Sequence, residues 1–144
     1  MTANAQPQQA PSPELVIETL MAHQRSDALT AAIQLDLFRA IGEGPGDPAS
    51  LARRCSVSKR GVRILCDYLT IVALLFKQGD RYVHTPTSAA FLDPNSPACF
   101  ASAAHFMGHT MIRKPHRRLS EIVRDGRTNL HGAGDVEPEN PIWV

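Results

Sequence analysis

The chain has 144 residues, a formal net charge of +1 and 43% hydrophobic residues. This length fits one domain with a single hydrophobic core, and the near-neutral charge excludes the broad basic surface of a dedicated nucleic-acid-binding protein. No uncharged apolar run approaches the roughly 20 residues that span a bilayer. Cys55, Cys66 and Cys99 form no C-x-x-C pair, which favours reduced, buried thiols in a cytoplasmic protein.

Residues 1–12 are rich in Ala, Gln and Pro and carry no charged side chain. They lack the basic start and the apolar core of a signal peptide. Their low complexity predicts a disordered lead.

Two helices are expected between Pro13 and Ile41. Pro13 suits the first turn of a helix, with Ser12 as its cap. The polar stretch His23–Asp27 then separates two apolar sets with helical spacing. Gly42–Pro48 ends the second helix.

The sequence Gly42-Glu43-Gly44-Pro45-Gly46 imitates a glycine-rich cofactor loop. Such a loop follows a buried strand and opens a helix, whereas this one follows a helix. Pro45 also removes an N–H group that would face a phosphate. A plain turn between helices is therefore favoured.

A helix–turn–helix is predicted over Asp47–Phe76, followed by a hairpin over Phe76–Thr85. Asp47 before Pro48 is a strong helix start, and Ser58 is suited to cap the second helix. Gly79-Asp80 is typical of a hairpin turn. Together these elements predict a winged-helix arrangement.

Three further helical segments are expected after the hairpin. They are a short turn at Ser88–Leu92, a helix over Ala98–Ile112 and a helix over Pro115–Arg124 that Gly126 ends. The chain is polar and rich in Gly and Pro from Thr128. No βαβ alternation is visible, so a Rossmann-type domain is excluded.

The second helix of the helix–turn–helix does not resemble a DNA-recognition helix. Its polar side chains occupy one arc of roughly 100°, and apolar side chains fill most of the rest, which is typical of a helix buried on more than one side. The polar arc holds Lys59, Arg60, Arg63, Asp67 and Thr70. We therefore interpret the motif as a packing module.

Candidate binding chemistry gathers on the predicted helix Ala98–Ile112. His105 and His109 share a face but lack the glutamate or the third ligand of a zinc site, so no metal site is predicted. The alternatives are core or interface histidines, or the wall of a substrate pocket lined by His105, Met107, His109 and Met111. No G-x-S-x-G elbow presents a nucleophile. The basic run Arg113–Arg118 favours a solvated face or an ion-pair partner for another chain.

The order and spacing of four segments resemble one family. The segments are Ala28–Pro45, Asp47–Leu75, Gly79–Leu92 and Leu119–Val144. They resemble the N-terminal dimerisation domain of two-domain, S-adenosylmethionine-dependent O-methyltransferases that act on small molecules. The resemblance implies a mainly α, winged-helix-like dimerisation domain with a small β-hairpin at residues 13–127. Residues 128–144 would start a linker to a C-terminal methyltransferase domain that this chain lacks.

The resemblance also implies a function for the parent enzyme. That enzyme would transfer a methyl group from S-adenosylmethionine to a hydroxyl of a small aromatic acceptor of secondary metabolism. The cofactor and catalytic residues would lie in the C-terminal domain, so neither is expected here. This domain would form an intertwined homodimer and, through Ala98–Ile112, a wall of the acceptor pocket, with no nucleic-acid or membrane partner. The alternative is a winged-helix transcription regulator whose Ala98–Ile112 helix senses a ligand.

Overall fold

The computed structural model describes residues 11–44, 46–108 and 110–126, apart from the side chains of His105, Thr110, Met111, Lys114 and Pro115. The expected lead lies mostly outside these residues, and the expected linker at 128–144 lies wholly outside them. The described elements are, in chain order, α1 (Glu14–Gln34), α2 (Leu37–Gly42), α3 (Pro48–Arg54), α4 (Lys59–Ile71), β1 (Leu75–Gln78), β2 (Arg81–His84), α5 (Pro86–Phe91), α6 (Ala101–Gly108), α7 (Thr110–Arg117) and α8 (Leu119–Asp125).

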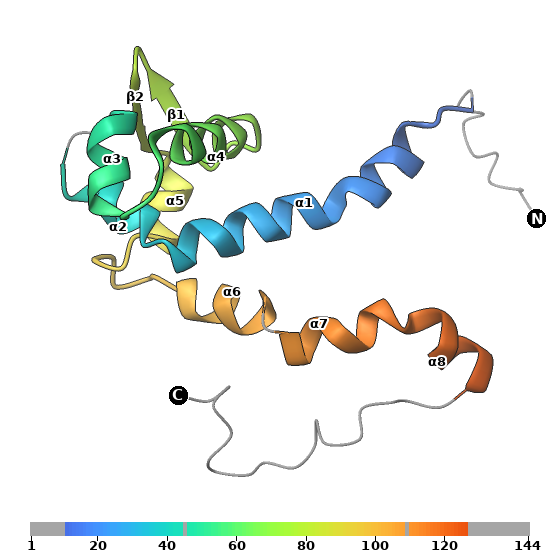
Figure 1. Ribbon diagram of the computed structural model, residues 1–144. Helices are drawn as coiled ribbons and strands as arrows, with labels where there is room; N and C mark the ends of the chain where they lie inside the picture. Colours follow the sequence, from blue (N-terminus) through green and yellow to red (C-terminus); the bar gives the residue numbers. More distant parts are fainter. Residues whose placement is uncertain (1–10, 45, 109, 127–144) are drawn as a thin grey trace, which may run out of the picture.

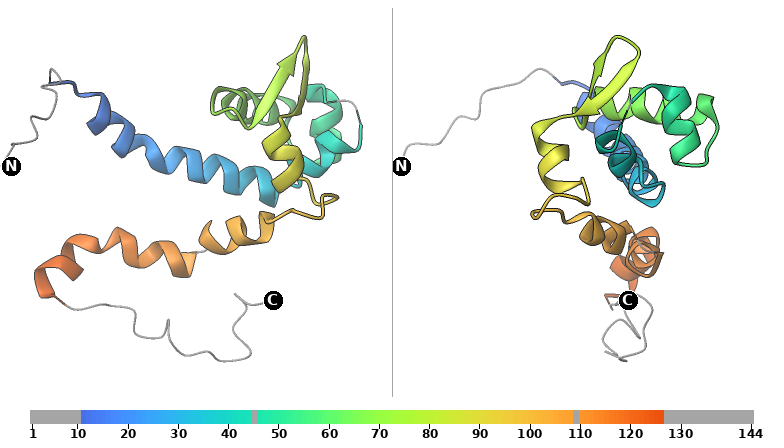
Figure 2. Two further views of the ribbon diagram at one scale, coloured as in Figure 1. Left: turned by 180° about the vertical axis from the view of Figure 1, so that it is seen from behind. Right: turned by 90° about the vertical axis from the view of Figure 1, so that its left-hand side faces the viewer.

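The elements are arranged as a crowded cluster with two long extensions (Figures 1 and 2). Helices α2–α5 and the hairpin gather around the C-terminal end of α1, and α1 projects from this cluster as an arm. Helices α6–α8 run back alongside that arm, with α6 packed against α1. Within the described ranges, no helix is both long and apolar enough to cross a membrane.

Local capping produces the helix–turn–helix as predicted. The Asp47 carboxylate accepts hydrogen bonds from the backbone N–H groups of Ala49 and Ser50 at 3.1 and 3.0 Å. The Ser58 hydroxyl likewise accepts from the N–H of Gly61 at 3.0 Å. Both caps satisfy donors that the first turn of a helix leaves unpaired.

The second helix of this motif is shorter than predicted. Helix α4 ends at Ile71 rather than near Phe76. Ala73 adopts a left-handed φ of 60°, which turns the chain out of the helix. Leu75 and Phe76 then belong to β1, where Leu75 is fully buried.

The hairpin has the turn that the sequence predicts. Strands β1 and β2 pair antiparallel, with Phe76 opposite Val83 and Gln78 opposite Arg81. Gly79 closes the two-residue turn at a φ of +64°, a conformation that glycine adopts without steric cost.

Two other expected helix boundaries are wrong. Helix α1 continues through the polar stretch His23–Asp27, because these side chains lie on the exposed arm and the stretch holds no glycine or proline. The break comes instead at Asp36, which has a φ of 52°. Pro115 lies inside α7 rather than opening a helix, while Gly126 does end α8, at a φ of +62°.

The core lies within the cluster rather than along the arm. Leu51, Leu69 and Leu75 are fully buried where α3, α4 and β1 meet, and Tyr82 covers them from β2. Ala32 is the only buried residue of α1. The three cysteines are free thiols, but only Cys66 is buried, and burial raises its pKa to about 12.

Candidate functional site

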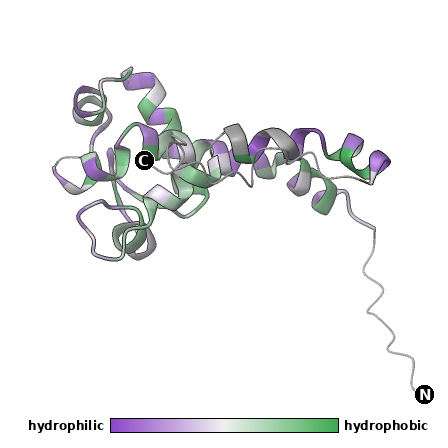
Figure 3. Ribbon diagram, turned by 90° about the horizontal axis from the view of Figure 1, so that it is seen from below, coloured by the Kyte–Doolittle hydropathy of each residue, from purple (hydrophilic) through white to green (hydrophobic). Residues whose placement is uncertain are grey.

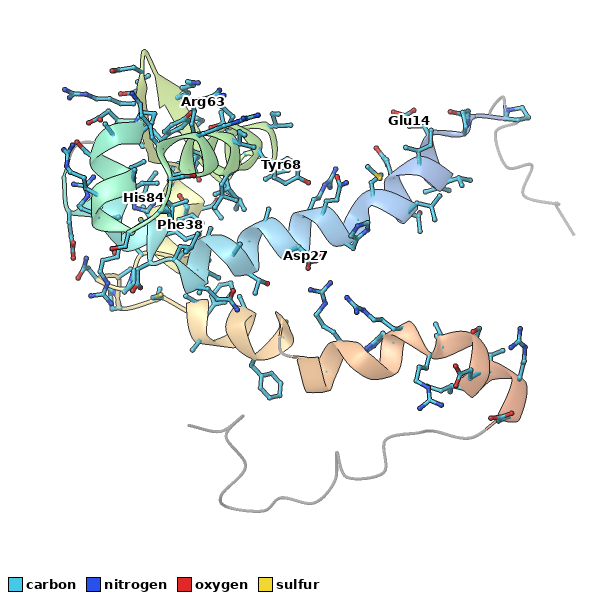
Figure 4. The ribbon with its side chains drawn as sticks, viewed as in Figure 1. Glu14, Asp27, Phe38, Arg63, Tyr68 and His84 are labelled. Atoms are coloured by element: carbon cyan, nitrogen blue, oxygen red, sulfur yellow. The ribbon has the colours of Figure 1, made fainter. Side chains whose placement is uncertain are left out.

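An open groove lies between the arm and the returning helices. Its volume is about 450 Å³, within the range of small-molecule pockets. Helical spacing builds both walls, because residues four apart share a face. The lining residues are His23 and Asp27 from α1, Met107 from α6, and Ile112, Arg113, His116 and Arg117 from α7. Figure 4 shows the Asp27 side chain pointing from α1 toward α7.

An ion pair joins the two walls of this groove. The Arg113 guanidinium donates a hydrogen bond to Asp27 Oδ1, across 86 positions of sequence. This hydrogen bond, together with the nearby charge of Arg117, holds the pKa of Asp27 below its usual value. The sequence predicts that Arg113 faces solvent or another chain, whereas the structure pairs it with Asp27 of its own chain.

The two histidines of the groove are oriented by their own helices. Nδ1 of His23 lies 2.8 Å from the carbonyl oxygen of Leu20, and Nδ1 of His116 lies 2.8 Å from that of Ile112. A carbonyl oxygen only accepts, so each Nδ1 carries a proton. The Nε2 atom of each ring therefore remains for other partners.

The structure places one of the four predicted pocket residues. Met107 is 68% exposed and lines the groove. His109 and the side chains of His105 and Met111 lie outside the described part of the chain, so their assignment stays a prediction. Sequence reasoning missed His23 and Asp27, and their i, i+4 spacing, which places them on one face of a helix, was the available signal.

One small residue of α6, Gly108, allows this helix to pack closely against α1. A Cβ added to Gly108 would lie 2.8 Å from Thr30 Oγ1 and 2.9 Å from Thr30 Cγ2. Gly108 thus allows α6 to approach α1 closely.

A second charged network fixes the hairpin on α4. Asp67 Oδ1 accepts from Lys77 Nζ at 2.6 Å and from the Tyr82 hydroxyl at 2.7 Å, while Oδ2 accepts from Arg63 Nη1 at 3.0 Å. Lys77 Nζ also lies 5.1 Å from the centre of the Tyr82 ring. Arg63 and Lys77 are thus engaged within the domain, which fits a packing role for the winged helix.

This network predicts a pH-dependent stability. The hydrogen bonds from Lys77 and Tyr82 hold the pKa of Asp67 below its ordinary value. The stabilisation that ionised Asp67 gives the folded state is therefore fully present above the pKa that this carboxyl has in the unfolded chain. It is lost as the pH falls through the lower pKa of Asp67 in the folded state. Asp67→Asn should lower the free energy of unfolding at pH 7, and the difference from wild type should shrink at pH 3.

Urea denaturation at the two pH values measures this difference. Asp80→Asn in the hairpin turn is the matched control, because it removes the same charge outside the network. A difference for Asp67→Asn that is equally large at both pH values would contradict the electrostatic explanation.

Large apolar side chains are exposed along the N-terminal half of α1. Figure 3 colours the ribbon by hydropathy and shows hydrophobic residues outside the cluster, along the two extensions. Their exposed fractions lie between 46% and 73%, and we call this set the apolar arm: Leu15, Val16, Ile17, Leu20 and Met21. Leu119 and Val123 of α8, and Ile64 and Ile71 of α4, are also exposed. Several large apolar side chains exposed on one short stretch of helix commonly mark an interaction site.

A comparison with models of protein families identifies the family to which this chain belongs. The family model of the O-methyltransferase dimerisation domain matches residues 17–94, which is more than half of the chain. The chain belongs to this family. The predicted fold class, a mainly α dimerisation domain with a small hairpin, is confirmed.

Known methyltransferases match over most of the chain. Acetylserotonin O-methyltransferase of Mus musculus is 32% identical over 124 residues, covering 81% of this chain and 32% of that protein. The tetracenomycin polyketide synthesis 8-O-methyl transferase TcmO of Streptomyces glaucescens is 29% identical and covers 83% and 35%. This chain therefore spans about a third of the length of these curated relatives.

Solved structures share the fold. A putative O-methyltransferase from Nostoc punctiforme has a TM-score of 0.81 and 40% identity, covering 93% of this chain and 41% of that one. Human N-acetylserotonin methyltransferase, solved in complex with SAM, has a TM-score of 0.72 and 28% identity, covering 88% and 37%. The family match favours the methyltransferase interpretation over the transcription regulator.

Proposed function

We propose that this domain joins two copies of an S-adenosylmethionine-dependent O-methyltransferase into an intertwined homodimer and forms one wall of the acceptor pocket. The observation that carries the proposal is the apolar arm. Five large side chains of one helix stay exposed, although the cluster beside them has a well-packed core. A dimerisation domain needs such a surface, and obligate homodimers commonly bury about 2,000 Å² or more.

The proposed reaction transfers the methyl group of the cofactor to a hydroxyl of a small aromatic molecule. The names of the relatives support this class, since they include acetylserotonin and polyketide O-methyltransferases and a 3-hydroxy-5-methyl-1-naphthoate 3-O-methyltransferase. An N,N-dimethyltransferase among them, OxyT of Streptomyces rimosus, shows that relatives differ in the acceptor atom. Positioning of the acceptor would be the contribution of this domain, because catalysis of methyl transfer depends on alignment of the reacting atoms.

The cofactor and the catalytic groups are assigned to another part of the parent enzyme. The described elements include no parallel strand followed by a glycine loop and a helix, which is the unit that binds such cofactors. We place the parent enzyme in the cytoplasm, without a nucleic-acid or membrane partner. Its winged helix would serve packing, since α4 turns Val62, Cys66 and Leu69 into the core.

Sedimentation velocity at low micromolar concentration tests the dimer. We expect this chain to sediment as a dimer, because burying the apolar arm removes it from water. Calorimetry with S-adenosylmethionine should show no saturable binding to this chain. A monomer that binds no hydrophobic dye would contradict the proposed homodimer. One-to-one binding of S-adenosylmethionine at micromolar concentration would contradict the proposal that the cofactor binds in another part of the parent enzyme.

A further inference from the structure

Helix α8 carries an apolar face that no described part of its own chain covers. Leu119 and Val123 are 55% and 72% exposed, and Ile122 is half-buried. Their spacing places these three residues on one side of the helix, and we call them the α8 face. None of the seven residues of α8 is buried. So short a helix has little stability unless such a face packs against something, so the α8 face needs a cover.

The α8 face and the apolar arm lie at the same end of the domain. Helix α1 projects from the cluster, α6–α8 extend in the same direction, and α8 and the start of α1 form the two tips (Figures 1 and 2). Both sets of apolar side chains remain exposed, so neither tip covers the other within the chain.

The apolar arm alone is small for a dimer interface. Stable interfaces of standard size take about 20–30 residues from each partner, whereas the arm offers five large apolar side chains. The dimer therefore needs further surface, and the α8 face is available beside the arm's end of the domain. The exposed Ile64 and Ile71 of α4 are weaker candidates, because that helix already buries three residues in the core and scattered exposed apolar residues are common.

Charge distinguishes two ways of covering the arm. Residues 1–22 carry the acidic side chains Glu14 and Glu18 and no Lys or Arg, so an arm packed against a second arm would bring like charges together. Residues 113–125 carry five Lys or Arg side chains and two acidic ones. Opposite charges across an interface favour one arrangement of partners over another. The arm is therefore complementary in charge to α7 and α8.

We propose that the apolar arm of each copy packs against the α8 face of the other copy, with Glu14 and Glu18 beside the basic residues of α7 and α8. One two-fold axis produces both contacts, because in an isologous interface the same pair of surfaces meets twice. The basic run Arg113–Arg118 then faces acidic residues of a second chain. The inference rests on the proposed function, because it names the surface that receives the arm in the proposed homodimer.

Mixing two singly substituted chains tests this contact. Leu20→Glu places a carboxylate on the arm, and Val123→Lys places an ammonium group on the α8 face. Each variant alone should dimerise weakly, because the introduced charge meets an apolar surface at both contacts. In the mixed dimer, one contact holds an opposite-charge pair and the other contact is unaltered. We expect the mixed dimer to bind at least tenfold more tightly than either variant homodimer, as measured by native mass spectrometry of equimolar mixtures.

Two further mixtures with Leu20→Glu are the controls. Val123→Glu changes the same position but pairs like charges, so it should give no preference for the mixed dimer. Ile71→Lys places the ammonium group on an exposed position of α4, outside the proposed contact. Circular dichroism spectra of each variant verify that the helices are retained.

The outcomes separate this inference from the proposed function. A wild-type chain that stays monomeric overturns both. A wild-type dimer combined with no preference in the Leu20→Glu and Val123→Lys mixture overturns the inference alone, as does a Val123→Lys homodimer as tight as wild type. A preference in the mixture with Ile71→Lys would place the arm on α4 and would also overturn it. A preference confined to the mixture with Val123→Lys supports the contact between arm and α8.

Discussion

Gly46→Ala is expected to lower the free energy of unfolding by ~3 kcal/mol. A Cβ at this position would lie 2.0 Å from the carbonyl oxygen of Tyr82 and 3.0 Å from its carbonyl carbon. Those atoms belong to the backbone of β2, so they cannot rotate away as a side chain would. The strand would have to separate from the loop, and the 3.0 Å hydrogen bond from the Tyr82 N–H to the Gly46 carbonyl would be lost.

Gly44→Ala is the matched control for this substitution. A Cβ there would meet the end of the flexible Arg54 side chain, which can move at little cost. Urea denaturation at one fixed protein concentration compares both variants with wild type. Equal stability of the two variants would show that the contact between loop and strand does not constrain position 46.

Leu20→Glu is expected to raise the dissociation constant of the proposed dimer more than 100-fold. Leu20 is 68% exposed on the apolar arm, so the substitution removes little packing within the chain. In the dimer it would bury a carboxylate without a partner, which costs several kcal/mol. A 100-fold change corresponds to about 2.7 kcal/mol.

Sedimentation equilibrium over a range of concentrations measures this change. Asp80→Asn in the hairpin turn is the control, because it alters charge by one unit at an exposed position outside α1. Circular dichroism should show that both variants keep their helices. An unchanged dissociation constant for Leu20→Glu would exclude the apolar arm from the interface.

The elements that depend on neighbouring residues were predictable from the sequence. Asp47 and Ser58 cap their helices as expected, and the Gly79-Asp80 turn forms, because each of these features acts within three or four residues of itself. The extent of α1 was mispredicted, because polar residues on an exposed arm carry no signal of a helix end. The end of α4 was also mispredicted, since no glycine or proline marks the left-handed turn at Ala73 that leads Leu75 into the hairpin.

The candidate site was only partly predictable. Met107 was identified from the character of its helix, but Asp27 and Arg113 meet across 86 positions, and helical periodicity does not reveal such a pairing. The glycine-rich loop is explained instead by its contact with the hairpin. Gly46 is needed for close approach to Tyr82, not for a phosphate.

The burial pattern of α1 has a consequence for how the protein assembles. A helix of 21 residues that buries only Ala32 within its own chain gains little from intramolecular packing along its first half. In the proposed dimer, that half completes its hydrophobic contacts only against another polypeptide. The last step of assembly is then the association of two chains, and its rate depends on the square of the chain concentration. Dilution therefore slows this step, while simultaneous synthesis of neighbouring copies accelerates it.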